Sequence, residues 1–160
     1  NLSNAKLESL FNWKSLETSP NMSPDSRKIA FVSDIAHPRR PQIYIHNLAT
    51  KKTERVTFKG FYNSSPKWSP DGTQLVYERQ NKGIFQLYKY NLPTRRHIQL
   101  TFGRHNSEKP DWSPNGRQII FSAKLKKFPK LYYISSFGGR IIRVTKNPLN
   151  ISETNPVWSK

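Results

Sequence analysis

The stretch Ser65-Pro66-Lys67-Trp68-Ser69-Pro70-Asp71-Gly72 decides the fold, because the chain repeats it at nearly constant spacing. A variant, Pro20-Asn21-Met22-Ser23-Pro24-Asp25-Ser26, lies 46 residues before it, and Pro110-Asp111-Trp112-Ser113-Pro114-Asn115-Gly116 lies 44 residues after it. After a further 46 residues the segment Pro156-Val157-Trp158-Ser159 begins the pattern again. Self-similarity at this period predicts a repeat architecture.

Other positions keep the same register. Tyr44, Tyr88 and Tyr132 are 44 residues apart, and a Val-Thr or Leu-Thr pair recurs at the same interval. Between these landmarks each unit contains four short runs of alternating residues, separated by Pro, Gly, Asn and Asp, which predicts four strands per unit. We expect strands at residues 19–23, 27–33, 42–47 and 53–58, then at 65–69, 74–79, 84–92 and 97–102, then at 109–113, 118–123, 130–135 and 140–144.

Antiparallel meanders of four strands that stack face to face are the blades of a β-propeller. The sequence therefore predicts an all-β fold with three four-stranded antiparallel blades plus flanking strands. We expect a lead-in at residues 1–18 with an orphan outer strand near 6–11, blades at 19–64, 65–108 and 109–154, and the inner strand of a following blade at 155–160. Propellers have about four to eight blades, so these blades belong to a longer propeller or their open ends favour self-association.

Composition narrows the choice of partner. The chain of 160 residues has no cysteine, no apolar run long enough for a membrane span and a formal charge of +17, which favours acidic partners. The basic residues fall in hairpins on both rims, and no nucleic-acid-binding motif occurs, so we expect a protein partner and not nucleic acid. An electrostatic binder of an anionic polymer stays open as an alternative, and salt dependence would identify it.

Motifs for catalysis or cofactor binding are absent from the sequence. It has no Gly-x-Ser-x-Gly elbow, no phosphate loop and no His-Glu-x-x-His, and its four histidines do not pair at ligand spacing. Asp25, Asp71 and Asn115 each follow a Ser-Pro step, where capping of a turn is their expected role. We therefore predict a protein without catalytic residues, metal or cofactor.

The order of these elements resembles the PD40-type repeats of TolB-like propellers over residues 19–160: Pro-x-Trp-Ser-Pro-Asp-Gly, then Leu-Val-Tyr, then Gln-Leu-Tyr, then Gln-Leu-Thr. The resemblance implies a six-bladed propeller in a periplasmic protein of the Tol-Pal system, which supports envelope integrity and protein transport. It implies binding, without catalysis, of a peptidoglycan-associated lipoprotein at one face near the axis. Prolyl oligopeptidase-family peptidases and pectin-degrading lyases carry similar propellers, which leaves an enzyme's propeller domain as an alternative.

Candidate binding residues come from the loops that lead into the inner strands. The resemblance implies functional roles for His105 with Asn106, and for Thr154. In a propeller the corresponding loops of successive blades, here residues 61–64, 103–108 and 149–155, converge at the axial mouth. We therefore predict the following protein-binding residues: Asn63, Ser64, His105, Asn106, Ser107, Glu108, Thr154 and Asn155.

Overall fold

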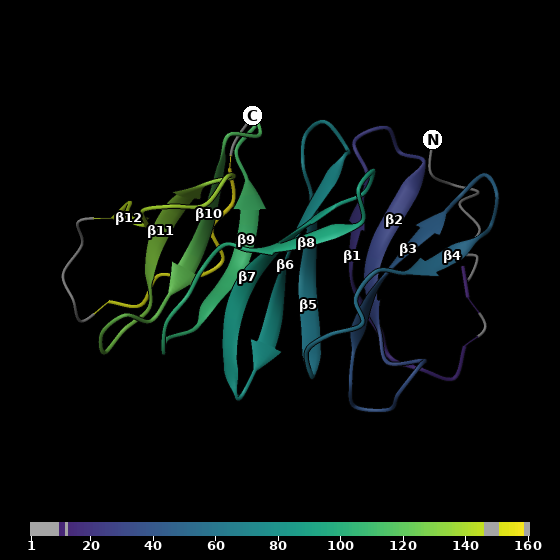
Figure 1. Cartoon of the computed structure of the whole chain (residues 1–160), viewed down its shortest axis with the longest axis horizontal. Helices are drawn as coiled ribbons and strands as arrows, with labels where there is room; N and C mark the ends of the chain where they lie inside the picture. Colours follow the sequence, from purple (N-terminus) through teal and green to yellow (C-terminus); the bar gives the residue numbers. More distant parts are fainter. Residues whose placement is uncertain (1–9, 12, 146–150, 159–160) are drawn as a thin grey trace, which may run out of the picture.

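Three four-stranded antiparallel sheets lie side by side in a computed structural model that describes residues 10–11, 13–145 and 151–158 (Figure 1). Within each sheet the strands follow chain order, so each sheet is a meander. The predicted all-β architecture is confirmed. The strands are β1 (Glu17–Met22), β2 (Lys28–Ser33), β3 (Gln42–Asn47), β4 (Thr53–Arg55), β5 (Tyr62–Trp68), β6 (Gln74–Asn81), β7 (Ile84–Asn91), β8 (Arg96–Gln99), β9 (Ser107–Trp112), β10 (Gln118–Ala123), β11 (Lys130–Ser135) and β12 (Ile142–Arg143).

The fourth strand of each sheet is shorter than the sequence predicts, and a threonine explains two of the three cases. β4 ends at Arg55, and although the Val56 N–H still donates to the Ile43 carbonyl at 2.7 Å, the Ile43 N–H donates to the hydroxyl of Thr57 at 2.9 Å instead of to a main-chain carbonyl. The Leu87 N–H donates to the Thr101 hydroxyl in the same way, also at 2.9 Å. The threonine hydroxyl thus replaces the main-chain carbonyl as the last hydrogen-bond acceptor between the third and fourth strands.

The inner strands begin earlier than predicted and contain a bulge. Tyr62 to Ser64 pair with Glu78 to Gln80, the register then shifts across Ser65 and Pro66, and pairing resumes at Lys67. The same shift occurs in β1 and β9. Proline cannot donate to the ladder, so a bulge at this step keeps the strand in the sheet on both sides of it.

The Ser-Pro-Asp-Gly turn closes the hairpin between the first two strands, as predicted. Asp71 Oδ1 accepts hydrogen bonds from the Ser69 hydroxyl at 2.5 Å and from the Thr73 N–H at 3.0 Å. The Gly72 N–H donates to the Ser69 carbonyl, with a φ of 69° that suits glycine. Asp25 and Asn115 make equivalent contacts in the other two sheets.

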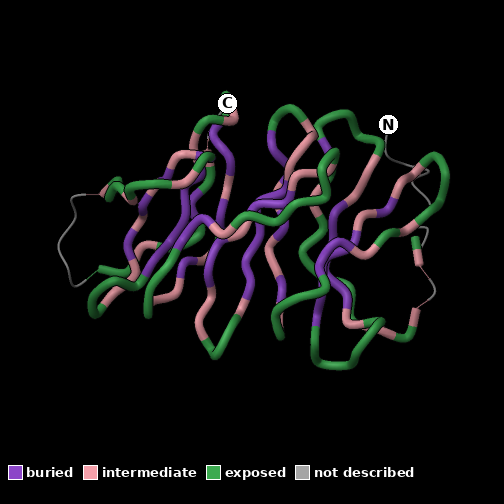
Figure 2. The backbone as a smooth tube through the Cα atoms, in the orientation of Figure 1, coloured by how far each residue is buried: buried purple, intermediate pink, exposed green. Residues whose placement is uncertain are grey.

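Alternate residues of β6 face opposite neighbours. Leu75 and Tyr77 pack in a core with Val32 and Ile43 of the first sheet, whereas Val76 packs in a second core with Phe121 of the third sheet. The middle sheet is therefore apolar on both faces, and Figure 2 shows its central strands as mostly buried. Burial on both faces fixes the register, because a shift by one residue would exchange the two cores.

The repeated tryptophans link neighbouring sheets. The indole N–H of Trp68 donates to the Asn21 carbonyl at 3.0 Å, and that of Trp112 donates to the Lys67 carbonyl at 3.0 Å. Trp158 follows part of this pattern, since its main-chain N–H donates to Asp111 Oδ2 at 3.1 Å, as that of Trp68 donates to Asn21 Oδ1. Packing between sheets is thus their role, as the sequence indicates.

Aromatic residues ahead of β1 cover the outer face of the first sheet. The ring of Phe11 stacks on Trp13 and on Phe31, with its centroid 4.6 and 4.8 Å from theirs, and it meets His46 edge to face. Most of the predicted orphan strand, at residues 6–9, lies outside the described residues, and residues 155–158 form no strand. The division into blades and the self-association of open ends stay predictions.

A polar latch joins each sheet to the start of the next. It comprises a residue near the start of the third strand (the first residue of β3 and β11, the third of β7), the threonine after the fourth strand, and the residue three positions before the proline of the next repeat. In the first latch, Gln42 Oε1 accepts hydrogen bonds from the Thr57 hydroxyl at 2.8 Å and from Asn63 Nδ2 at 3.0 Å. All three residues are buried.

The other two latches keep the threonine but differ elsewhere, with Ser107 in place of Asn63 in the second, and Lys130 and Glu153 in place of Gln42 and Asn63 in the third. In the second latch, Gln86 Nε2 donates to the carbonyls of Gly103 and His105, but Gln86 Oε1 and the Ser107 hydroxyl are buried without a partner in the described part of the chain. In the third, Lys130 forms an ion pair with Glu153 at 3.9 Å, and the Thr145 hydroxyl donates to Glu153. The position is fixed by the architecture, and its chemistry differs at each junction.

The difference between latches predicts unequal costs for one substitution. Thr57→Val removes two hydrogen bonds and leaves the Ile43 N–H unpaired, so we expect a loss of about 2 kcal/mol in the free energy of unfolding. Within the described residues, Thr101→Val removes one hydrogen bond of this kind and should cost about 1 kcal/mol. Urea unfolding measures both. Exposed Thr50→Val should change stability by less than about 0.5 kcal/mol, and equal costs at residues 57 and 101 would contradict the latch.

Candidate functional site

A groove forms where the inner strands of the three sheets approach one another. Its volume is about 280 Å³, and four X-Pro steps line it: Ser19-Pro20, Ser65-Pro66, Lys109-Pro110 and Asn155-Pro156. The strand β5 lies between β1 and β9 and contacts both. Inner strands that converge in this way define the axial side of a propeller, so the groove is the candidate binding site.

The backbone at these steps has an unusual conformation. The residue before each proline has a positive φ, of 52° at Ser19, 51° at Ser65, 56° at Lys109 and 53° at Asn155. A residue before proline ordinarily adopts an extended conformation, and positive φ in a non-glycine residue costs about 1–3 kcal/mol. At Ser19, Ser65 and Lys109, strand pairing on both sides of the bulge holds this conformation in place, whereas Asn155 lies outside any strand. Paired backbone therefore fixes three of the four steps of the groove.

Two carboxylates lie behind the groove. Glu78 is buried, and its side chain accepts hydrogen bonds from the Lys109 N–H at 2.6 Å and from the Ser64 hydroxyl at 2.8 Å. Burial raises the pKa of Glu108, and the nearby charge of Glu78 raises it further. These contacts position the backbone at Lys109, whose side chain is exposed and lines the groove together with that of Lys67.

Residues of β7 form hydrogen bonds to the loop of His105 to Glu108, one of the loops predicted to bind a partner. Asn106 Oδ1 accepts a hydrogen bond from the Phe85 N–H at 3.1 Å, and the His105 carbonyl accepts one from Gln86 at 2.8 Å. The His105 imidazole is partly buried, and its Nε2 has no hydrogen-bond partner among the described residues. Burial lowers the pKa of His105, so the ring is neutral at neutral pH.

The eight predicted residues occupy different environments. Asn63 and Ser107 are fully buried in the latches, where their side chains face the interior. Thr154 and Asn155 are exposed, and Asn155 is the member of the set that lines the groove. The structure therefore brings these residues near one side of the inner strands without making all of them surface contacts, and their role in binding stays a prediction.

Sequence analysis missed the residues that form most of the groove. The sequence signal was the recurrence of the four prolines at intervals of 46, 44 and 46 residues, whereas the positive φ of the residue before each one is visible only in the structure. Within the described ranges no group of three or more His, Cys, Asp or Glu side chains could hold a metal ion. No helix in the described part is long and apolar enough to cross a membrane.

Comparison with known proteins agrees with this geometry. The family model of the TolB beta propeller domain, PD40, matches residues 1–160. The Tol-Pal system protein TolB of Alcanivorax borkumensis is 49% identical over 65 residues, which are 41% of this chain and 15% of that protein. The chain therefore spans only a small part of its curated relatives.

Solved structures share the fold. The crystal structure of TolB from Acinetobacter baumannii matches with a TM-score of 0.70 and 28% identity, over 85% of this chain and 34% of that one. The β-propeller domain of the Trilobed protease from Pyrococcus furiosus matches with a TM-score of 0.67 over 85% of this chain and 44% of that one, at 16% identity, so this likeness concerns the fold alone. The chain belongs to the PD40 family of TolB β-propeller domains.

Proposed function

We propose that the chain binds a protein partner, without catalysis, through the face that carries the groove of X-Pro steps and its rim loops. The observation that supports this most directly is the fourfold recurrence of a strained backbone step around one groove. Strain of this kind concentrates at functional sites. A rigid groove also limits the conformational entropy that the protein loses when a partner binds.

The partner we propose is a Pal-like peptidoglycan-associated lipoprotein, with the periplasm as the compartment. The curated relatives are named Tol-Pal system proteins, which supports this choice. Likeness to the propeller of a protease at 16% identity favours no second function, because it extends to the fold alone. Lys67 and Lys109 in the groove suit an acidic surface on the partner.

Binding to the soluble domain of the Pal protein from the same organism tests this proposal by calorimetry. Lys67→Glu/Lys109→Glu should weaken binding about tenfold or more, because it reverses charge in the groove. The matched control Lys51→Glu/Lys52→Glu changes the same net charge at the exposed β3–β4 hairpin and should alter the dissociation constant less than twofold.

Two outcomes would contradict the proposal. No binding by the unsubstituted chain would exclude this partner. Equal weakening by both double variants, with a steep log-linear loss of affinity in salt, would instead indicate an electrostatic binder of anionic polymer.

His105 provides a pH test of the rim. Because burial lowers its pKa in the folded chain, the unfolded chain binds more protons below the usual value of about 6.5, and stability falls as pH drops through that window. His46 and His97 shift in the same direction. Urea unfolding at pH 7 and pH 5 should show a smaller acid-induced loss for His105→Gln than for the unsubstituted chain. The exposed control His37→Gln should retain the full loss, and an unchanged loss in His105→Gln would refute the neutral, buried imidazole.

A further inference from the structure

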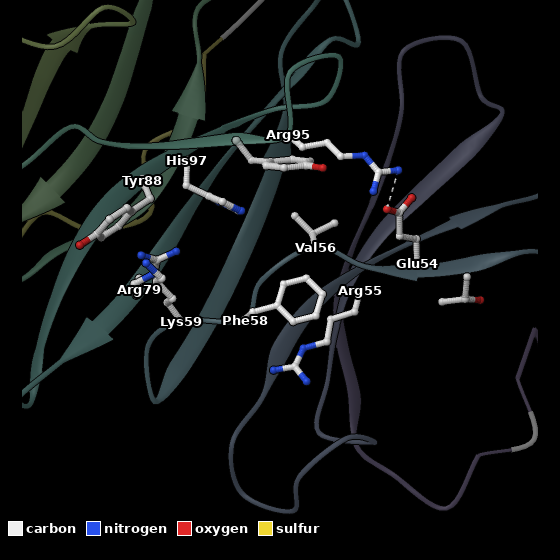
Figure 3. Close-up of a pocket in the computed structure, with 11 residues that line it drawn as sticks. Glu54, Arg55, Val56, Phe58, Lys59, Arg79, Tyr88, Arg95 and His97 are labelled. Carbon is white, nitrogen blue, oxygen red and sulfur yellow. Dashed lines mark ion pairs between the residues drawn. The ribbon is translucent and has the colours of Figure 1, made fainter.

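A second, larger hollow of about 770 Å³ lies between the first and second sheets, near their fourth strands (Figure 3). Side chains from β4, β8 and the segment after β4 surround it, with Arg79 of β6 and Tyr88 of β7 forming one wall. None of the residues that line the groove of X-Pro steps lines this hollow. It is a separate site within the described chain.

Arg79 is the central residue of the hollow. It is only 9% exposed, and its guanidinium lies 4.1 Å from the centroid of the Tyr88 ring. Its Nη2 donates to the Tyr77 hydroxyl at 2.7 Å, and its Nε donates to Asn63 Oδ1 at 3.3 Å. Among the described residues no carboxylate lies within ion-pair distance of it. Burying a charge without a counter-ion is unfavourable, so an anion bound in the hollow would stabilise the Arg79 guanidinium.

Two further polar residues are connected to Arg79. The Tyr77 oxygen accepts a hydrogen bond from Arg79, and it is hydrogen-bonded to His97 Nδ1 at an oxygen–nitrogen distance of 2.9 Å. In a neutral His97 with its proton on Nε2, Nδ1 is the acceptor of this bond. Burial lowers the pKa of His97, and the charge of Arg79 lowers it further, which agrees with that state.

The internal repeat shows that the fold does not require these residues. Forty-four positions later, Phe121, Ala123 and Ile141 stand where the middle sheet has Tyr77, Arg79 and His97. Phe121 and Ala123 belong to the apolar core between the second and third sheets, where Ala123 is 2% exposed, and the partly buried Ile141 packs against that core. The middle sheet therefore differs from the third sheet at three equivalent positions, and its residues there, Tyr77, Arg79 and His97, are connected by hydrogen bonds.

The surroundings of Arg79 are strongly positive. Arg55, Lys59 and Arg95 also line the hollow, against one carboxylate, Glu54, which pairs with Arg95 at 3.1 Å. Arg55 donates to the Thr57 carbonyl at 2.7 Å and lies over the Phe58 ring. Figure 3 shows Lys59 beside Arg79 on one wall, with Val56 and Phe58 facing the centre. The hollow thus combines cationic groups with an apolar floor.

We propose that this hollow binds the oxyanion of a small ligand, a carboxylate or a phosphate group, with the guanidinium of Arg79 as the main contact and the Lys59 ammonium as the second. Arginine bound through Nε and Nη2 to fixed partners is held in one orientation and leaves Nη1 for an anion. Tyr88 and Phe58 would pack against the apolar part of the ligand. The proposal does not depend on the partner-binding face proposed above.

The test uses two probes, inorganic phosphate and glutarate, each titrated at constant ionic strength. The Arg79 Nε–H resonance in a proton–nitrogen correlation spectrum should shift and saturate with at least one probe. The probe that binds more tightly identifies whether the natural ligand carries a phosphate or a carboxylate. Absence of a saturable shift with both probes would overturn the proposal.

The decisive variant transfers the residues of the next sheet into this one. Tyr77→Phe/Arg79→Ala/His97→Ile should fold, because the chain already uses that set between its second and third sheets, and circular dichroism during heating checks this. Binding of the probe, followed by calorimetry, should weaken by about tenfold or more. Retained affinity in the folded triple variant would overturn the proposal.

A milder pair of variants guards against failure of the triple variant to fold. Lys59→Gln removes an exposed cation at the hollow, and we expect probe affinity to fall by about threefold. Lys82→Gln makes the same charge change in the exposed β6–β7 hairpin and should leave affinity unchanged. An equal loss of probe affinity in the two variants would mean that binding depends on net charge alone, and the proposed site would be wrong.

Discussion

The arrangement of the sheets depends on the polar latch that connects the end of each sheet to the segment that follows it. Thr57 and Thr101 each accept a hydrogen bond from a main-chain N–H of the third strand. The Thr57 hydroxyl also donates to Gln42, which in turn accepts from Asn63 of the next inner strand, and the Thr145 hydroxyl donates to Glu153. Because these side chains connect the end of one sheet to the segment that follows, local hydrogen bonds help to set the spacing between sheets. The tryptophans, the two apolar cores and the groove are arranged around that spacing.

The regular part of the fold could be read from sequence because it repeats. The bounds of β3, β10 and β11 agree with the predicted ranges, since apolar alternation and turn residues specify them locally. The ends of the fourth strands could not be predicted from alternation. Val56 continues the apolar pattern, is buried and still donates to the Ile43 carbonyl, yet β4 ends at Arg55, where the Thr57 hydroxyl replaces a main-chain carbonyl as acceptor for the Ile43 N–H.

The candidate sites were harder to predict, for opposite reasons. The groove of X-Pro steps is built from backbone conformation, and no side-chain motif announces the positive φ at Ser65 or Lys109. The polar residues around Arg79 differ from those at the equivalent positions of the third sheet. Alignment of the repeats identifies shared residues, so it did not point to this hollow. Asn63 connects the first latch to the hollow, since it donates to Gln42 and also accepts a hydrogen bond from Arg79.

The tryptophans also give each layer its own optical signal. Trp13 lies on the outer face of the first sheet, Trp68 is in the core between the first and second sheets, and Trp112 is in the core between the second and third. Trp158 is tied to Asp111 of the third sheet. Indole emission depends on local polarity, so chains that retain a single tryptophan would report separately on each layer. The repeat that builds the fold has therefore also placed one fluorescent probe, Trp68 or Trp112, at each of the two junctions between the three sheets.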